Sequence, residues 1–160
     1  MTDAVGFAAL CLTGVLAGTL FALEWALGAI PRELLTSVLP IVTRRFGPNL
    51  PPPPDGGIGQ LPPLAFGSLA FSLAFAILAR HSTVTLVLGL VATAGVVVGI
   101  VSTTIFLGPL NARISAWAAE DPHGAPWDDA LKRWFAFNLV RAFAAGIAFA
   151  ALAAALAFAR

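Results

Sequence analysis

The hydrophobic pattern of this chain consists of four long apolar stretches separated by shorter segments rich in polar residues, proline or glycine. The stretches cover approximately residues 4–30, 61–79, 83–107 and 127–158. About 20 consecutive apolar residues are enough for a helix to cross the hydrocarbon core of a bilayer. The pattern therefore predicts four transmembrane helices.

The segments between the stretches predict the connections. Residues 46–60 contain four consecutive prolines followed by an Asp-Gly-Gly sequence. Because proline lacks an amide donor and clashes with the preceding helical turn, we expect a long loop here, either an ordered lid or a disordered segment. Residues 80–82 form a tight connection. Gly108 and Pro109 are expected to break the third span, before a short interfacial helix at residues 111–120.

These elements predict an all-α fold, a four-helix transmembrane bundle with up-down topology. The long Pro/Gly-rich loop joins helices 1 and 2, and the short interfacial helix lies between helices 3 and 4. We expect residues 1–160 to form a single membrane domain. With four crossings, both termini lie on one side, here named the terminal side. The two longer connections lie on the opposite side, here named the loop side.

Composition supports a membrane protein and excludes other classes. The chain is 59% hydrophobic and 11% charged, whereas soluble domains are roughly 45–50% apolar and 25% charged. A formal net charge of +1 argues against a nucleic-acid partner, which requires a basic stripe. The single cysteine, Cys11, lies within the first apolar stretch, so we expect it to be buried by packing.

The distribution of basic residues predicts the orientation. Cytoplasmic loops of membrane proteins carry an excess of Lys and Arg. The loop side contains most of them, namely Arg32, Arg44, Arg45, Arg113, Lys132 and Arg133. The first stretch lacks the basic segment of a signal peptide, so we expect it to be retained. We therefore expect a multi-pass protein of the cytoplasmic (inner) membrane with both termini outside.

Small residues repeat on two spans at the spacing that brings membrane helices close together. Gly14 and Gly18 lie in the first span, and Gly95 and Gly99 lie in the third. Small-x-x-x-small pairs allow close helix contact. We expect packing within the chain, with homo-oligomerisation through either pair as the alternative.

One acid and one base lie inside the apolar stretches. Glu24 follows the uncharged residues 4–23, and Arg141 precedes the uncharged residues 142–159. If the first and last spans cross in opposite directions, these side chains lie at similar depth. Ionisable groups in a membrane cost roughly 2.5–3.5 kcal/mol each on insertion scales and tend to be paired or functional. Two interpretations stay open, a structural ion pair and a small-molecule pocket.

Further polar and aromatic residues favour the pocket. Trp134, Asn138 and Arg141 are separated by four and three residues, which places them on one helical face. The third span contributes Ser102 and Thr103, and Asn111 follows just beyond the expected break at Pro109. Trp134 and Trp25 provide aromatic walls, although tryptophans near this depth also suit an interfacial belt.

Metal chemistry has little support in the sequence. His81 belongs to the terminal side and His123 to the loop side, about 30 Å apart in a bundle of bilayer height. The chain also lacks the Glu-x-x-His pairs of di-iron bundles. We expect no metal site and no tightly bound cofactor.

The sequence Gly108-Pro109-Leu110-Asn111, followed by Trp117, Trp127 and then Trp134-x6-Arg141, resembles the membrane family that includes the anthrone oxygenases. The resemblance implies a four-helix membrane protein and, from characterised members, cofactor-independent oxidation of an activated aromatic methylene by molecular oxygen. Some members carry a histidine near position 138, where this chain has an asparagine that does not titrate.

Applied to these residues, the resemblance implies a flat apolar substrate that stacks by Trp134. Glu24, or a water that it activates, removes a C–H proton, since a carboxylate withdrawn from water is the better base. Arg141 and Asn138, together with Asn111, stabilise the developing oxyanion. This base role requires Arg141 to contact the substrate oxygen rather than Glu24 alone.

Three rival interpretations remain at this stage. A non-enzymatic protein could bind a lipid, a quinone or another apolar small molecule in the same pocket. A transporter is disfavoured because no internal repeat is evident. A structural membrane subunit would tolerate the loss of both Glu24 and Arg141.

Overall fold

The computed structural model describes residues 2–46, 61–120 and 126–158, and all regular secondary structure in these residues is helical. The elements in chain order are α1 (Thr2–Gly28), α2 (Arg32–Phe46), α3 (Leu61–Leu78), α4 (Thr83–Ser102), the π-helical turn η1 (Thr103–Leu107), α5 (Gly108–Glu120) and α6 (Trp127–Phe158). The loop expected at residues 46–60 lies outside the described residues apart from Phe46, which ends α2.

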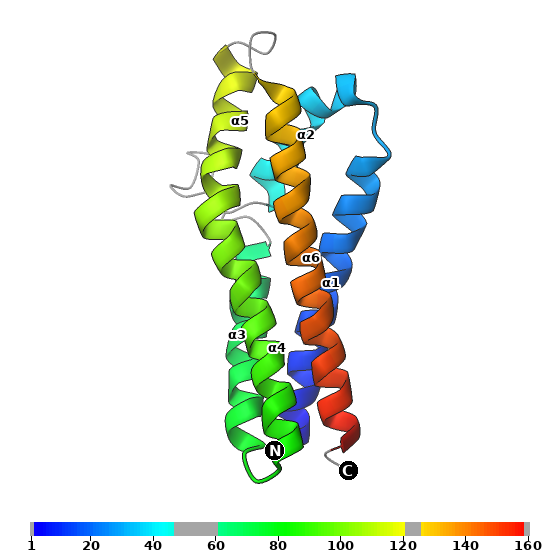
Figure 1. The fold of residues 1–160 in the computed structure, drawn as a ribbon, viewed down its shortest axis with the longest axis vertical. Helices are drawn as coiled ribbons and strands as arrows, with labels where there is room; N and C mark the ends of the chain where they lie inside the picture. The colour runs from blue at the N-terminus through cyan, green and yellow to red at the C-terminus, as the bar shows by residue number, and fades with distance from the viewer. Residues whose placement is uncertain (1, 47–60, 121–125, 159–160) are drawn as a thin grey trace.

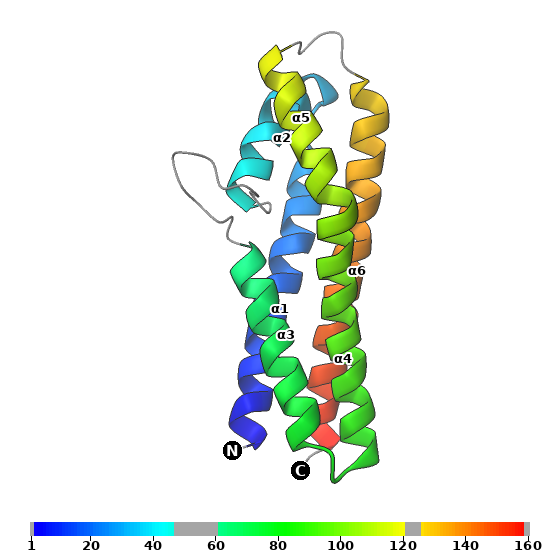
Figure 2. The same ribbon diagram turned by 90° about the vertical axis from the view of Figure 1, so that its left-hand side faces the viewer.

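The long helices run alongside one another, parallel to the long axis of the molecule (Figures 1 and 2). Contacts between α4 and α6, α1 and α6, α1 and α3, and α3 and α4 hold them together. Both chain ends lie at the same end of the long axis, and α5 and the start of α6 lie at the other (Figure 1).

Four helices are long and apolar enough to cross a membrane, namely Thr2–Gly28, Leu61–Leu78, the continuous Thr83–Ala118 and Trp127–Phe158. Large apolar side chains face outward from every one of them, including Phe7, Ile77, Val98 and Ile147. Such a surface suits lipid rather than water. These features indicate a multi-pass membrane protein.

A helix that the sequence pattern did not predict follows the first span. Residues 32–46 lie in the polar segment between the first two apolar stretches, yet they form α2, which lies above α3 along the long axis (Figure 2). The carbonyl of Pro31 accepts the amides of Leu34 and Leu35, which starts the helix. Leu35 and Leu39 then recur at helical spacing and are buried against α5 and α6. Their burial overrides the unfavourable Pro40 within the helix.

The expected break at Gly108 and Pro109 is also absent. Instead, α4 continues through η1 into α5 as one column (Figure 2). The Gly108 amide donates to the carbonyl of Thr103, five residues earlier. A π turn widens the helix locally, which accommodates a proline ring that would clash in a regular α-helix.

The two glycine pairs are divided between the interior and the outside. A Cβ on Gly95 would lie 2.6 Å from the Ala144 carbonyl oxygen, and one on Gly14 would lie 3.0 Å from Phe149. Gly18 and Gly99 have nothing within 4 Å of such an atom. The first glycine of each pair therefore allows α6 to approach closely, as expected for packing within the chain.

Cys11 differs from its expected position. Its side chain is exposed on the outer surface of α1 rather than buried. The apolar stretch of α1 is hydrophobic on all sides, so hydrophobicity alone does not indicate which side faces the interior.

Candidate functional site

A chain of hydrogen bonds connects three helices through buried and half-buried polar side chains. Asn138 Nδ2 donates to Glu24 Oε2 at 2.7 Å. On its other end, Asn138 Oδ1 accepts from Arg141 Nη2. Arg141 Nη1 donates to Thr103 Oγ1 at 3.1 Å, and Thr103 Oγ1 donates in turn to the Gly99 carbonyl at 2.8 Å. The expected acid and base therefore share one cluster.

The acid and the base do not form a direct ion pair. No Glu24–Arg141 contact lies within salt-bridge distance, and the only ion pair among the described residues joins the exposed Arg32 and Asp128. The carboxamide of Asn138, which is completely buried, lies between the two charges. Both ends of this amide are occupied, so Asn138 holds Glu24 and Arg141 in place.

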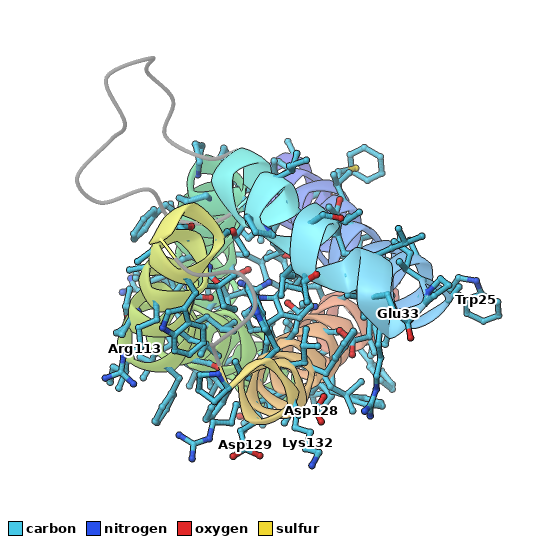
Figure 3. All side chains as sticks on the ribbon, turned by 90° about the horizontal axis from the view of Figure 1, so that it is seen from above. Trp25, Glu33, Arg113, Asp128, Asp129 and Lys132 are labelled. Atoms are coloured by element: carbon cyan, nitrogen blue, oxygen red, sulfur yellow. The ribbon has the colours of Figure 1, made fainter. Side chains whose placement is uncertain are left out.

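The α6 face predicted from the sequence faces the interior. Trp134, Asn138 and Arg141 are all buried, and each makes a side-chain hydrogen bond to another helix. Charged residues of the same helix point outward, as Asp129 and Lys132 do when viewed along the long axis (Figure 3). The hydrogen-bonding residues of α6 therefore face the interior, and its other charged residues face outward.

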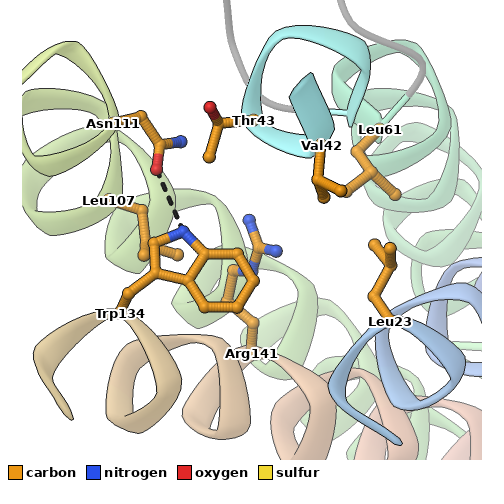
Figure 4. Close-up of a pocket in the computed structure, with 8 residues that line it drawn as sticks. All are labelled: Leu23, Val42, Thr43, Leu61, Leu107, Asn111, Trp134 and Arg141. Atoms are coloured by element: carbon orange, nitrogen blue, oxygen red, sulfur yellow. Dashed lines mark hydrogen bonds between the residues drawn. The ribbon is translucent and has the colours of Figure 1, made fainter. Parts of the chain in front are cut away.

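A pocket lies next to the cluster (Figure 4). Trp134 Nε1 donates to Asn111 Oδ1 at 3.1 Å, across the gap between α6 and α5. The guanidinium of Arg141 points into the same space. The lining residues are Leu23, Val42, Thr43, Leu61, Leu107, Asn111, Trp134 and Arg141. The cavity volume is about 20 Å³, which holds roughly one water molecule.

Several residues expected at the site do not line the pocket. Trp25 is 83% exposed and points away from the molecule (Figure 3). Ser102 is buried, yet neither it nor Thr103 lines the pocket. Glu24 is also absent from the lining, although its neighbour Leu23 contributes to it.

The sequence analysis missed the contribution of α2. Thr43 is buried and lines the pocket together with Val42, and its hydroxyl donates to the Pro40 carbonyl at 3.0 Å. Because residues 32–46 were expected as a connection, neither residue was a candidate. The recurrence of Leu35, Leu39 and Val42 at spacings of four and three was the signal available.

Two buried polar atoms near the site have no hydrogen-bond partner, Arg141 Nε and Ser102 Oγ. Leaving a buried donor unsatisfied costs about 1–3 kcal/mol, so the Arg141 guanidinium retains capacity for an additional acceptor. Within the described parts of the chain, no group of three His, Cys, Asp or Glu side chains could hold a metal ion.

Comparison with known proteins identifies one family. A family model described as anthrone oxygenase matches residues 57–151, more than half of the chain. The matched region contains Asn111, Trp134, Asn138 and Arg141 but not Glu24. No curated protein and no solved structure matches the chain.

Proposed function

Because the chain belongs to the anthrone oxygenase family, we propose that it oxidises an activated aromatic methylene group with molecular oxygen, without a bound cofactor. The observation that carries this proposal is the pocket in which the Arg141 guanidinium, the Asn111 amide and the Trp134 indole converge. A cation, an amide and an aromatic wall suit a flat apolar substrate that carries an oxygen at one edge.

The proposed reaction begins with removal of a proton from the methylene carbon. Glu24 takes this proton, directly or through a water, and the electron pair of the C–H bond moves into the conjugated system as an enolate. The enolate donates electrons to O₂, a C–O bond forms, and the proton held by Glu24 returns to the outer oxygen to give a hydroperoxide. Loss of water leaves a carbonyl, so that overall R₂CH₂ and O₂ yield R₂C=O and H₂O.

Arg141 is the proposed stabiliser of the enolate oxygen. Its guanidinium faces the pocket, and its Nε has no protein partner. Preorganised donors aimed at developing negative charge provide one of the largest catalytic effects in enzymes. Asn138 supports this role indirectly, because it binds Glu24 and Arg141 at opposite ends of one amide and prevents their direct pairing.

Substrate binding requires the pocket to expand. A cavity of about 20 Å³ accommodates one water, so a fused aromatic ring system must displace apolar side chains such as Val42 and Leu61. Both lie where α2 ends and α3 begins.

The proposed position in the membrane follows from helix length. At about 1.5 Å per residue, Thr103, Glu24 and Arg141 lie roughly 26–33 Å from the terminal-side ends of their helices. A hydrocarbon core is about 30 Å thick. The cluster therefore lies at the loop-side boundary of the core, where a membrane-dissolved substrate meets polar groups.

We further propose an up-down four-span arrangement in the inner membrane, with both termini outside. Exposed basic residues at the loop side, including Arg113 and Lys132 (Figure 3), favour a cytoplasmic location for that side. Oligomerisation through the glycine pairs remains a proposal, and it would use the open Gly18 and Gly99, since Gly14 and Gly95 pack against α6.

Oxygen uptake by the purified protein in lipid nanodiscs, measured with a panel of anthrone-like substrates, tests the activity. We expect substrate-dependent uptake that falls at least about 100-fold in Glu24→Gln, because general-base catalysis contributes about 10²–10⁴-fold. Glu33→Gln, which alters an exposed carboxylate on α2, is the matched control and should retain activity. Full activity in Glu24→Gln would exclude Glu24 as the base.

A second candidate function is non-enzymatic binding of a lipid, quinone or other apolar molecule. The absence of Glu24 from the pocket lining and from the matched region favours it. Saturable binding of a quinone, together with no oxygen uptake on any activated methylene, would support this alternative. Such binding should weaken in Arg141→Met.

A further inference from the structure

The geometry points to a role for the π turn η1, which Pro109 favours. This turn brings Thr103 and Asn111, the two partners of α6 side chains, onto one face of the α4–α5 column. Pro109 is thus a positioning residue: it is exposed and does not line the pocket, and it acts through the helix. The expected effect on catalysis rests on the proposed function, whereas the alignment of Thr103 with Asn111 does not depend on it.

Two hydrogen bonds to α6 require two side chains of the α4–α5 column to face the same way. Thr103, the first residue of η1, accepts from Arg141. Asn111, in the first turns of α5, accepts from Trp134. Both partners lie on the buried face of α6, so Thr103 and Asn111 must project from the same side of their own column.

A regular α-helix would not align them. Eight residues separate Thr103 from Asn111, and at about 100° per residue this separation leaves the two side chains roughly 80° apart. One π turn accommodates a single additional residue without advancing the helical phase. The separation then behaves as seven residues, and the two side chains lie within about 20° of each other.

The packing of the neighbouring residues agrees with this phase. Leu107 and Ile114, seven residues apart, are both buried in the cluster that contains Trp134. Within η1, residues Thr104, Ile105 and Phe106 are exposed on the outside. The additional residue is therefore accommodated on the outer side of the column, away from the site.

Pro109 makes the regular alternative unfavourable. In an α-helix its ring would clash with the carbonyl of Ile105, four residues earlier, and it offers no amide to that carbonyl. In the structure, the Gly108 amide instead donates to the Thr103 carbonyl. Pro109 thus selects the π turn and with it the alignment of Thr103 and Asn111.

Two deletion variants of equal length separate this inference from general damage to the helix. Both carry Pro109→Ala and lose one exposed residue, either Ile105 inside η1 or Ala112 after Asn111. Deleting Ile105 converts η1 to a regular α-helix and leaves Thr103 and Asn111 in place. Deleting Ala112 also restores the regular helix, but it moves Leu110 into the position of Asn111. Asn111 is then rotated about 100° away from Trp134.

The readout is the ¹⁵N–¹H resonance of the Trp134 indole in the full-length protein, without substrate. Trp134→Phe removes this resonance and so assigns it. Asn111→Ala gives the chemical shift of the indole without the hydrogen bond. We expect the wild-type position for the Ile105-deleted variant and the Asn111→Ala position for the Ala112-deleted variant. Deleting Ile105 with Pro109 retained should lower the unfolding temperature relative to the variant that also carries Pro109→Ala.

If the Ile105-deleted Pro109→Ala variant fails to fold, or shows the Asn111→Ala resonance, the inference is wrong. An Ala112-deleted variant that keeps the wild-type resonance would also overturn it. Since the resonance is recorded without substrate, it is independent of whether oxygen uptake occurs. If uptake occurs, kcat should be retained in the Ile105-deleted variant and reduced in the other.

Discussion

The side-chain amide nitrogen of Asn138 lies 2.7 Å from Oε2 of Glu24, which links the last membrane helix to the first. The same amide accepts from Arg141 through its oxygen. A carboxylate and a guanidinium at the same depth would normally pair directly, but here a neutral group separates them. This arrangement leaves Glu24 outside a tight ion pair, as the proposed base role requires.

Replacing Asn138 by leucine should destabilise the protein strongly for a single polar substitution. The change removes two hydrogen bonds to ionisable partners and leaves Glu24 and Arg141 less satisfied. We expect a loss of about 1–2 kcal/mol per bond, at the upper end of values for membrane proteins. Unfolding in mixed micelles measures this loss. Leu139→Ala, on the exposed side of α6, is the control and should change little.

Thr103→Val should weaken the site, whereas Thr104→Val should not. The two residues are adjacent, but only Thr103 accepts from Arg141. Thr104 bonds only to carbonyls of its own helix. We expect a loss of about 1 kcal/mol for Thr103→Val and a reduced rate of oxygen uptake. Equal effects for both variants would contradict the assigned contact.

Gly95→Ala should disrupt helix packing. The added Cβ would lie 2.6 Å from the Ala144 carbonyl oxygen, a backbone atom that cannot move without shifting α6. Overpacking of this kind costs about 1–3 kcal/mol. Gly99→Ala, one turn along the same helix, meets nothing within 4 Å and should retain the wild-type unfolding temperature. A similar decrease in both variants would show that Gly99 also lies in a contact, such as one between copies of the chain.

Trp134→Phe should cost more stability than Trp25→Phe. Trp134 is buried and its indole donates to Asn111, so the substitution removes a hydrogen bond and leaves unfilled volume. We expect a loss of about 1–2 kcal/mol. Trp25 is 83% exposed, and a change there should stay within about 0.5 kcal/mol. Chemical unfolding followed by circular dichroism compares the two without relying on tryptophan emission.

The Arg32–Asp128 ion pair should contribute little to stability. Its atoms lie 3.5 Å apart and both side chains are about 70% exposed, a setting in which ion pairs contribute roughly 0–1 kcal/mol and are screened by salt. Replacing both residues by alanine should shift the free energy of unfolding by less than about 0.5 kcal/mol. A larger loss that persists at high salt would indicate that the pair anchors α2.

Much of the fold could be predicted from the sequence, because lipid imposes a simple requirement. Backbone polar groups inside a bilayer must be satisfied within the segment, so a long apolar stretch is nearly always a helix. The bounds of α3 and α6 accordingly follow the hydrophobic pattern closely. The shared face of Trp134, Asn138 and Arg141 follows from helical periodicity alone.

Other features depended on tertiary contacts. Residues 32–46 combine charges, a proline and scattered leucines, and they form α2 where Leu35 and Leu39 are buried against α5 and α6. Pro109 predicts a break by local rules, but η1 accommodates its ring, and the burial of Leu107 and Ile114 before and after it keeps the column continuous. Trp25 and Cys11 were misplaced because an all-apolar helix gives no indication of which side faces inward.

The sequence by itself determined which residues lie in the membrane spans and that an acid and a base occur at matching depth. The tertiary structure decided which side chains meet, because a hydrogen bond depends on the rotation of each helix about its axis and on register between helices. Those quantities placed the amide of Asn138 between Glu24 and Arg141, and they brought Thr43 of α2 to the pocket. Hydrophobicity determines which residues of a helix lie within the bilayer, whereas close packing between helices determines which way each side chain faces.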